Sequence, residues 1–138
     1  MFNQILVPVD LSPHAELALA GLRQVATPSA SVELLHVIER IPGLGDDEVG
    51  DFYGQLESRA RQQLEIWASA LQADGFRTEL TLTIGKRALE IIRRARESGC
   101  DLLLLASHAL NPEEPARALG SVSHQVALIA PCPVLLLR

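Results

Sequence analysis

The last third of the chain holds a run of residues whose types suit the binding of an anion. Gly120, Ser121, Val122 and Ser123 come directly before a helical pattern, and serine is a preferred residue at the start of a helix. The first turn of a helix carries backbone N–H groups without intrahelical partners and the positive end of the helix dipole. A phosphate group is therefore the ligand that this run predicts.

Polar residues at the ends of apolar runs form a second group of candidates. Ser107 ends the run 101–107 and His108 follows it, and Asp10 follows a run near the start of the chain. Asp10 either caps a turn or accepts hydrogen bonds from a ligand amine or a ribose hydroxyl. Pro8 would remove a ladder donor from a central strand, and such irregularities tend to occur at functional sites.

Five apolar runs of strand length alternate with helical patterns in which apolar residues recur every three or four positions. The runs are 5–9, 31–38, 78–84, 101–107 and 133–137. This alternation predicts an α/β fold with an open, mostly parallel sheet and helices on both faces, in one domain spanning 1–138. The polar and apolar alternation in the third run is typical of an edge strand.

The glycine-rich and acidic segment 40–54 is either a mobile flap or a solvated connection, and the connection is the favoured interpretation. The second helix is expected to begin near Phe52. In open parallel sheets, ligands bind outside the carboxyl ends of the strands, where the strand order reverses. Val37 and Ile38 end the second run, so they join the candidates at this edge.

The composition excludes several classes of function. The net charge is −5 and the basic residues are dispersed, so we expect no nucleic-acid surface. No apolar stretch approaches the ~18 residues of a membrane span, and the chain begins almost at once with a strand-like run. We therefore expect a cytoplasmic protein without a signal peptide. Cys100 and Cys132 lack metal-binding spacing and are expected to be buried free thiols.

Five blocks of the sequence match a known family. They are ILVPVDLSPHAELAL at 5–19, LLHV at 34–37, GKRALEIIRRA at 85–95, DLLLLASH at 101–108 and GSVSHQVALIAPCPVLLLR at 120–138. Together they resemble the universal stress protein family over essentially the whole chain. The resemblance implies a Rossmann-like fold with strand order 3-2-1-4-5. It also implies a homodimer formed through the fifth strand, by Val134, Leu135, Leu136 and Leu137.

Many members of this family bind ATP, so the resemblance implies ATP as a ligand, with Mg²⁺ when it is bound. Adenine or ribose would meet Pro8, Val9 and Asp10, and the adenine pocket would be lined by Val37 and Ile38. The implied phosphate site consists of Gly120, Ser121, Val122 and Ser123, with Ser107 and His108 beside it. No motif assigns a catalytic residue or a metal ligand of the protein's own.

The loop before the phosphate run departs from the family's ATP-binding pattern, which is Gly-x-x-Gly, nine residues, then Gly-Ser or Gly-Thr. Ala106 and Ala109 occupy the two early glycine positions, and the spacer 110–119 is ten residues long. Alanine costs ~1 kcal/mol at positive φ and little elsewhere. The leading hypothesis is a dimeric stress-response regulator that binds an adenine nucleotide. A dimeric interaction protein with a vestigial pocket is the alternative, and a slow ATPase using His108 or Ser121 is a third.

Overall fold

The computed structural model describes all residues except 41–42, 44–45, 108–112 and 114–120. Within the described residues, five parallel strands form one sheet in the order β3-β2-β1-β4-β5, which confirms the predicted fold. The strands are β1 (Phe2–Pro8), β2 (Ala26–Glu39), β3 (Arg77–Gly85), β4 (Leu102–Ala106) and β5 (Val134–Leu137). The described helices are α1 (His14–Val25), α2 (Asp46–Ala73), α3 (Arg87–Ser98) and α5 (Val122–Ile129).

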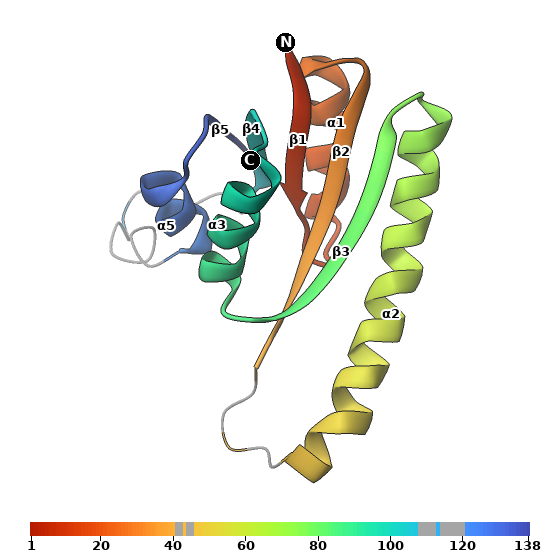
Figure 1. Cartoon of the computed structure of the whole chain (residues 1–138), viewed down its shortest axis with the longest axis vertical. Coiled ribbons are helices and arrows are strands. Elements are labelled where there is room, and N and C mark those ends of the chain that lie inside the picture. Colours follow the sequence, from red (N-terminus) through yellow and green to blue (C-terminus); the bar gives the residue numbers. More distant parts are fainter. Residues whose placement is uncertain (41–42, 44–45, 108–112, 114–120) are drawn as a thin grey trace.

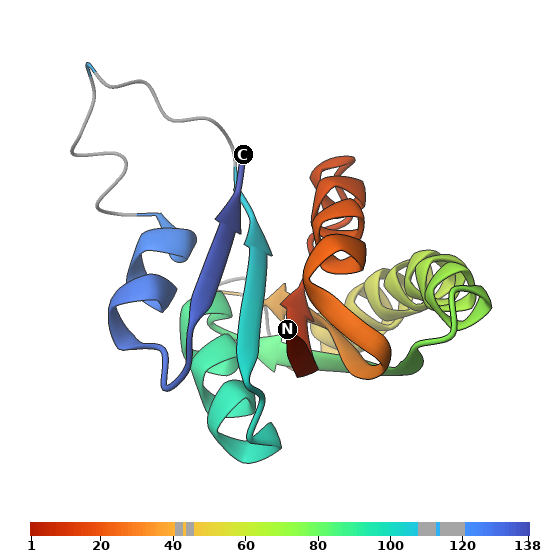
Figure 2. The same ribbon diagram turned by 90° about the horizontal axis from the view of Figure 1, so that it is seen from above.

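Helices cover both faces of the sheet. Helices α1 and α2 lie on one face, and α3 and α5 lie on the other (Figures 1 and 2). Side chains of β1 alternate between these faces, because successive residues of a strand point to opposite sides. Ile5, Val7 and Val9 pack under α1 and α2, whereas Leu6 packs under α3 and α5. The near-continuous apolar run of β1 follows from this burial on two sides.

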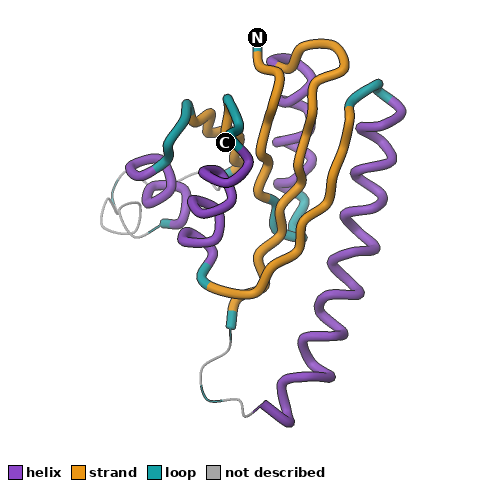
Figure 3. Tube along the Cα trace, in the orientation of Figure 1, coloured by secondary structure: helices purple, strands orange, loops and turns teal. Residues whose placement is uncertain are grey.

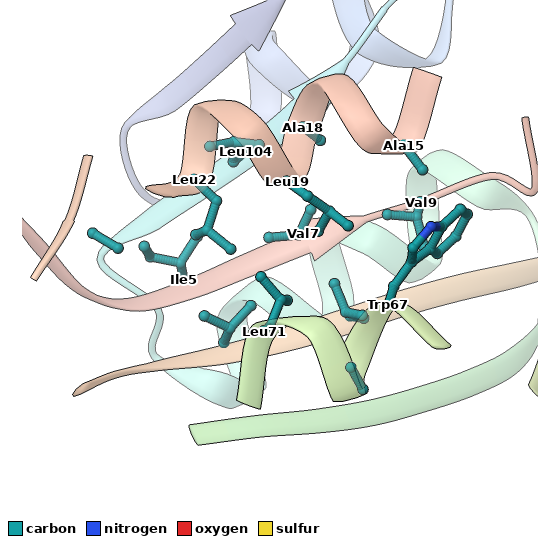
Figure 4. Close-up of a cluster of buried hydrophobic side chains, with 14 of the residues drawn as sticks. Ile5, Val7, Val9, Ala15, Ala18, Leu19, Leu22, Trp67, Leu71 and Leu104 are labelled. Carbon is teal, nitrogen blue, oxygen red and sulfur yellow. The ribbon is translucent and has the colours of Figure 1, made fainter. Parts of the chain in front are cut away.

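The core on the α1/α2 face joins one side of each helix to the strands. Figure 4 shows Ile5 and Val7 of β1 between the two helices. The α1 side chains lie above them in this view, and Trp67 and Leu71 of α2 lie below; the labelled α1 residues are Ala15, Ala18, Leu19 and Leu22. The three- and four-residue spacing of these helical positions makes one apolar stripe on each helix. Gly21 lies at the close approach of α1 to β5, since a methyl group there would stand 2.2 Å from Leu137 Cδ1.

An ion pair with little exposure fixes α3 to the sheet. Glu33 of β2 accepts hydrogen bonds from Arg94 Nε at 2.5 Å and Nη2 at 3.0 Å, and from the Thr81 hydroxyl at 2.7 Å. The hydrogen bonds from Arg94 to Glu33 raise the pKa of the Arg94 guanidinium. The Glu33 side chain is only 10% exposed and that of Arg94 is 30% exposed. The pair therefore joins β2, β3 and α3 in a place where solvent screens it only partly.

Two elements are longer than the sequence predicts. Helix α2 begins at Asp46, so the prediction of a connection over 40–54 is wrong for residues 46–54. Tyr53 is buried and extends the apolar stripe of α2, and this packing outweighs the weak helix propensity of Gly50 and Gly54. Strand β2 begins at Ala26 rather than near residue 31.

The early start of β2 follows from its pairing with β1. Phe2 pairs with Ala26, and the register then shifts so that Gln4 pairs with Ser31. Ser29, at φ 65°, lies in the extra length of β2 and accommodates this irregularity. Figure 3 shows β1, β2 and β3 running in one direction, so their carboxyl ends reach the same end of the molecule. Among the described residues, no helix is long and apolar enough to cross a membrane.

Candidate functional site

A pocket of about 230 Å³ lies at the carboxyl ends of β1 and β4, where the strand order reverses. It brings together eight of the eleven residues predicted to bind a nucleotide, from four separate parts of the chain. These are Pro8, Val9, Asp10, Val37, Ser107, Ser121, Val122 and Ser123. Ile38 does not line it, because Val37 already points to the α3/α5 face and its neighbour must point away. His108 and Gly120 lie outside the described residues.

Pro8 lies where β1 and β4 separate. The ladder between β1 and β2 continues to Pro8 and Leu35, whereas the ladder between β1 and β4 ends at Leu6 and Leu103. Val9 N–H donates to Leu35 O at 2.8 Å, on the β2 side. Consecutive residues of a strand direct their backbone groups to opposite neighbours, so the Pro8 nitrogen faces β4 and offers it no hydrogen. The missing donor thus lies beside the pocket, as the sequence analysis expects of a strand irregularity.

The strand end at Val9 is held from β2 by two contacts. The first contact is the hydrogen bond from Val9 N–H to Leu35 O. The second is between the Val9 carbonyl oxygen and Nδ1 of the buried His36, which are 2.8 Å apart. A carbonyl can only accept, so Nδ1 of His36 carries the proton. The Val9 side chain packs in the α1/α2 core. Val9 therefore lines the pocket through its backbone, and His36 positions that backbone.

Asp10 fills the first of the two roles that the sequence leaves open, and its place in the pocket wall suits the second. Its Oδ1 accepts from Ser12 N–H at 3.0 Å and from the Ser12 hydroxyl at 2.5 Å, so it closes the turn before α1. The residue also lines the pocket. A carboxylate held in this way presents a fixed hydrogen-bond acceptor to a ligand that brings hydroxyl or amino donors.

The start of α5 forms the opposite wall. Ser121 is the N-cap residue, and its hydroxyl accepts from His124 N–H at 3.1 Å. The first intrahelical bond is donated by Gln125 N–H to Ser121 O at 3.1 Å. The amides of Val122 and Ser123 precede that bond and lie at the positive end of the helix dipole, within the pocket wall.

Ala106, one of the two departures from the ATP-binding pattern, does not obstruct the pocket. It ends β4 in regular pairing with Leu137, and positive φ among the described non-glycine residues occurs only at Ser29. The Ala106 methyl packs with the core on the α1/α2 face, while the apolar pocket wall belongs to the α3/α5 face. Alanine is therefore unstrained here. Ala106 lines the pocket through its backbone, while its methyl group packs on the α1/α2 face. Ala109 lies outside the described residues.

Arg87 is a pocket residue that the sequence analysis did not identify. It begins α3, directly after the carboxyl end of β3, and is the only basic residue among the described residues of the pocket wall. Its Nε lies 4.0 Å from Glu39 Oε1, a loose contact between two side chains with substantial exposure. The rule that ligands bind at the carboxyl ends of strands could have found it, since every helix that follows a strand begins at that edge.

Apolar side chains complete the wall behind these polar groups. Leu35, Ile91 and Leu105 line the pocket together with Val37, and all four belong to the core on the α3/α5 face. The pocket thus has an apolar side, a carboxylate at the end of β1, and a helix N-terminus with an arginine nearby. This set suits a ligand with an apolar ring at one end and an anionic group at the other.

Comparisons with known proteins agree on one family. A model of the universal stress protein family matches residues 1–138. A universal stress protein of Thermus aquaticus is 32% identical over 142 residues, and the match covers all of both chains. The universal stress protein MJ0577 of Methanocaldococcus jannaschii is 29% identical over 158 residues, covering all of this chain and 96% of its own.

Solved structures extend the agreement to three dimensions. The structure of MJ0577 has a TM-score of 0.81 at 28% identity and covers 99% of this chain and 96% of that one. A universal stress protein in complex with cAMP has a TM-score of 0.65 at 20% identity, and the match covers 99% of this chain and 97% of that one. One from Archaeoglobus fulgidus in complex with dAMP has a TM-score of 0.67 at 20% identity and covers 99% and 98%. The chain belongs to the universal stress protein family.

Proposed function

We propose that this chain is a single-domain, cytoplasmic stress-response regulator that binds an adenine nucleotide, ATP being the leading candidate. The observation that carries the proposal is one pocket that combines an apolar wall, the Asp10 carboxylate and the N-terminus of α5. The family relatives in complex with cAMP and dAMP support adenine as the ring that this pocket would accept.

The phosphates would lie against α5. The amides of Val122 and Ser123 and the helix dipole favour an anion there, and the neighbouring serine hydroxyls add donors. Arg87 would contribute the positive charge that partly neutralises the phosphates. Its loose contact with Glu39 leaves it free to turn toward a stronger anionic partner.

The nucleoside would lie on the other side of the pocket. The adenine ring would contact the apolar residues Val37, Ile91 and Leu105, and the Asp10 carboxylate would accept from ribose hydroxyls. The volume of about 230 Å³ is smaller than the ~300–1,000 Å³ usual for ligand pockets, so part of the nucleotide would stay in solvent. Among the described residues no group of three potential metal ligands occurs, so Mg²⁺ would enter on the phosphates.

Calorimetric titration with ATP·Mg²⁺ tests whether the nucleotide binds. The Arg87→Ala variant tests whether its phosphates lie on the Arg87 side of the pocket. We expect the wild type to bind ATP and to be stabilised by about 2.7 kcal/mol at a hundredfold excess over Kd. Arg87→Ala should weaken ATP about tenfold and adenosine hardly at all, because the lost charge faces the phosphates. Arg96→Ala is the matched control, an exposed arginine at the other end of α3, and should bind as the wild type does.

A wild type that gives neither heat nor a thermal shift with millimolar ATP, dAMP or cAMP would rule the proposal out. The alternative, a dimeric interaction protein with a vestigial pocket, would then stand. The argument for that alternative is the replacement of two glycines by Ala106 and Ala109 together with the loop that carries two prolines and two glutamates at 112–115. The part of this argument that concerns Ala106 is weakened, because its methyl group packs on the α1/α2 face.

We also propose that the chain forms a homodimer through β5. Within the described part of the chain β5 pairs only with β4, and its residues Val134–Leu137 are all half-buried. Helix α5, which leads into β5, leaves Leu128 73% exposed and Ile129 56% exposed. An open edge strand with apolar neighbours is a surface that soluble proteins usually cover, and a symmetric dimer is the commonest way.

Light scattering during size exclusion tests the dimer. We expect twice the chain mass of 15.0 kDa for the wild type and a dimer at least tenfold weaker for Leu128→Glu. Ile66→Glu, at a residue 64% exposed on α2, adds the same charge away from β5 and should stay dimeric. A wild type that is monomeric at high micromolar concentration contradicts the proposal.

A further inference from the structure

Two cysteines far apart in sequence lie side by side. Cys100 Sγ and Cys132 Sγ are 3.7 Å apart, and both thiols are free. Cys100 is buried, as predicted, but Cys132 is half-buried rather than buried. The two sulfur atoms are in van der Waals contact. They would have to move closer by less than 2 Å to reach the disulfide bond length of about 2.05 Å.

The backbone holds the two cysteines next to each other. Cys100 comes just before β4 and Cys132 just before β5, and these strands are paired along their length. Leu103 N–H donates to Pro133 O at 2.9 Å, which fixes the two entering segments at the amino ends of the strands. The thiol pair therefore belongs to the rigid end of the sheet, at the opposite end of β4 from the nucleotide pocket.

Small molecules can reach both thiols. Cys132 is open to solvent in part. Cys100 lines a cavity of about 550 Å³ at the amino ends of β1, β2 and β3, together with Gln4, Glu33 and Ser98. A hydroperoxide is small enough to enter such a cavity.

We propose that Cys100 and Cys132 form a reversible redox couple that a hydroperoxide converts into an intramolecular disulfide. One thiolate attacks the peroxide oxygen and becomes a sulfenic acid, releasing water after proton transfer. The second thiol then attacks that sulfur, the S–S bond forms and a second water leaves. Two thiols and one hydrogen peroxide thus give one disulfide and two waters, and a dithiol reductant reverses the change. This proposal does not rest on nucleotide binding.

The surroundings of Cys132 affect the rate of disulfide formation. Burial and the neighbouring Cys100 raise the pKa of the Cys132 thiol to about 12. The thiolate is the reactive form, so attack by the Cys132 thiol is slow near neutral pH and becomes faster as the pH rises. The bond would close the loop 100–132, which carries β4 and α5, and so restrict the unfolded chain.

Oxidation of the purified full chain tests the proposal. After hydrogen peroxide, we expect the intact mass to fall by two hydrogen atoms and no thiol to remain for alkylation. The midpoint of thermal unfolding should rise by about 5–10 °C and return to its original value after dithiothreitol. The rate of disulfide formation should increase from pH 7 to pH 8.

Cys132→Ser and Cys100→Ser are the matched controls, and the half-buried position of Cys132 makes its variant safe for folding. Each should gain oxygen atoms or form a covalent dimer instead of losing hydrogen, and neither should show the reversible rise in stability. A wild type that keeps two alkylatable thiols, gains only oxygen atoms or forms only intermolecular disulfides would overturn the proposal.

Discussion

Replacing Ser123 with glutamate is expected to weaken ATP binding about 30-fold. The new carboxylate would stand in the first turn of α5, in the pocket wall against which the phosphates are proposed to lie. Repulsion between it and the phosphates by about 2 kcal/mol gives this factor. The fold should be unharmed, because an acidic residue near a helix N-terminus is favourable for the helix itself. Calorimetry with ATP and with adenosine measures the effect.

Gln125→Glu is the matched control for this substitution. It adds the same charge to the same helix at an exposed position that does not line the pocket. We expect its ATP affinity to stay within about threefold of the wild type, since the added charge is screened by solvent. If Ser123→Glu binds ATP with wild-type affinity while remaining folded, the phosphates do not lie at α5.

Glu33→Ala should lower the free energy of unfolding by about 2–3 kcal/mol. It removes the acceptor for both Arg94 and Thr81 and leaves a guanidinium with little exposure without its main partner. The 30% exposure of Arg94 and its weaker contact with Glu97 at 3.5 Å keep the loss below the roughly 3–5 kcal/mol that breaking a fully buried pair costs. Urea unfolding followed by circular dichroism measures the change.

Two control variants separate the cost of an unpaired buried charge from the cost of lost side-chain packing. Glu97→Ala removes an exposed partner of the same arginine and should cost less than about 0.5 kcal/mol. Glu33→Leu combined with Arg94→Leu should recover most of the loss, because no unpaired charge remains. The pKa of Arg94 is raised by its partner, so the contribution is fully present below the ordinary pKa of arginine as long as the Glu33 carboxylate is ionised. Equal losses for Glu33→Ala and Glu97→Ala would contradict the role given to the pair.

Periodicity in the sequence predicts the fold because each strand is buried on one or two faces. The five apolar runs and the helical stripes lead to the observed order of elements, and the strand-end rule leads to the region of the pocket. The limits of the elements were harder to predict. Tyr53 extends α2 through contacts made only in the folded chain, and Ser29 allows β2 to begin early.

The differences between the expected and the observed neighbours of these residues have a common physical origin. Arg87 reaches the pocket wall, and the two cysteines meet, through neighbours distant in sequence, and periodicity contains no information about such contacts. Ile38 was grouped with Val37 although a strand can direct only one of two successive side chains into a pocket. The apolar wall of the pocket lies on the α3/α5 face. Ile38, next to Val37 in β2, cannot direct its side chain to that face, and the Ala106 methyl group packs on the α1/α2 face.

The proline at the end of β1 has a consequence for the kinetics and selectivity of binding. Pro8 cannot extend the ladder toward β4, so on the sheet side the gap between the strands exists before any ligand arrives. Between the described ends of β1 and β4 no backbone hydrogen bond has to be broken to admit a ligand, so the sheet side of the pocket is preorganised. Discrimination among nucleotides would then depend on which of them fits a gap of fixed width, rather than on which of them can force two strands apart.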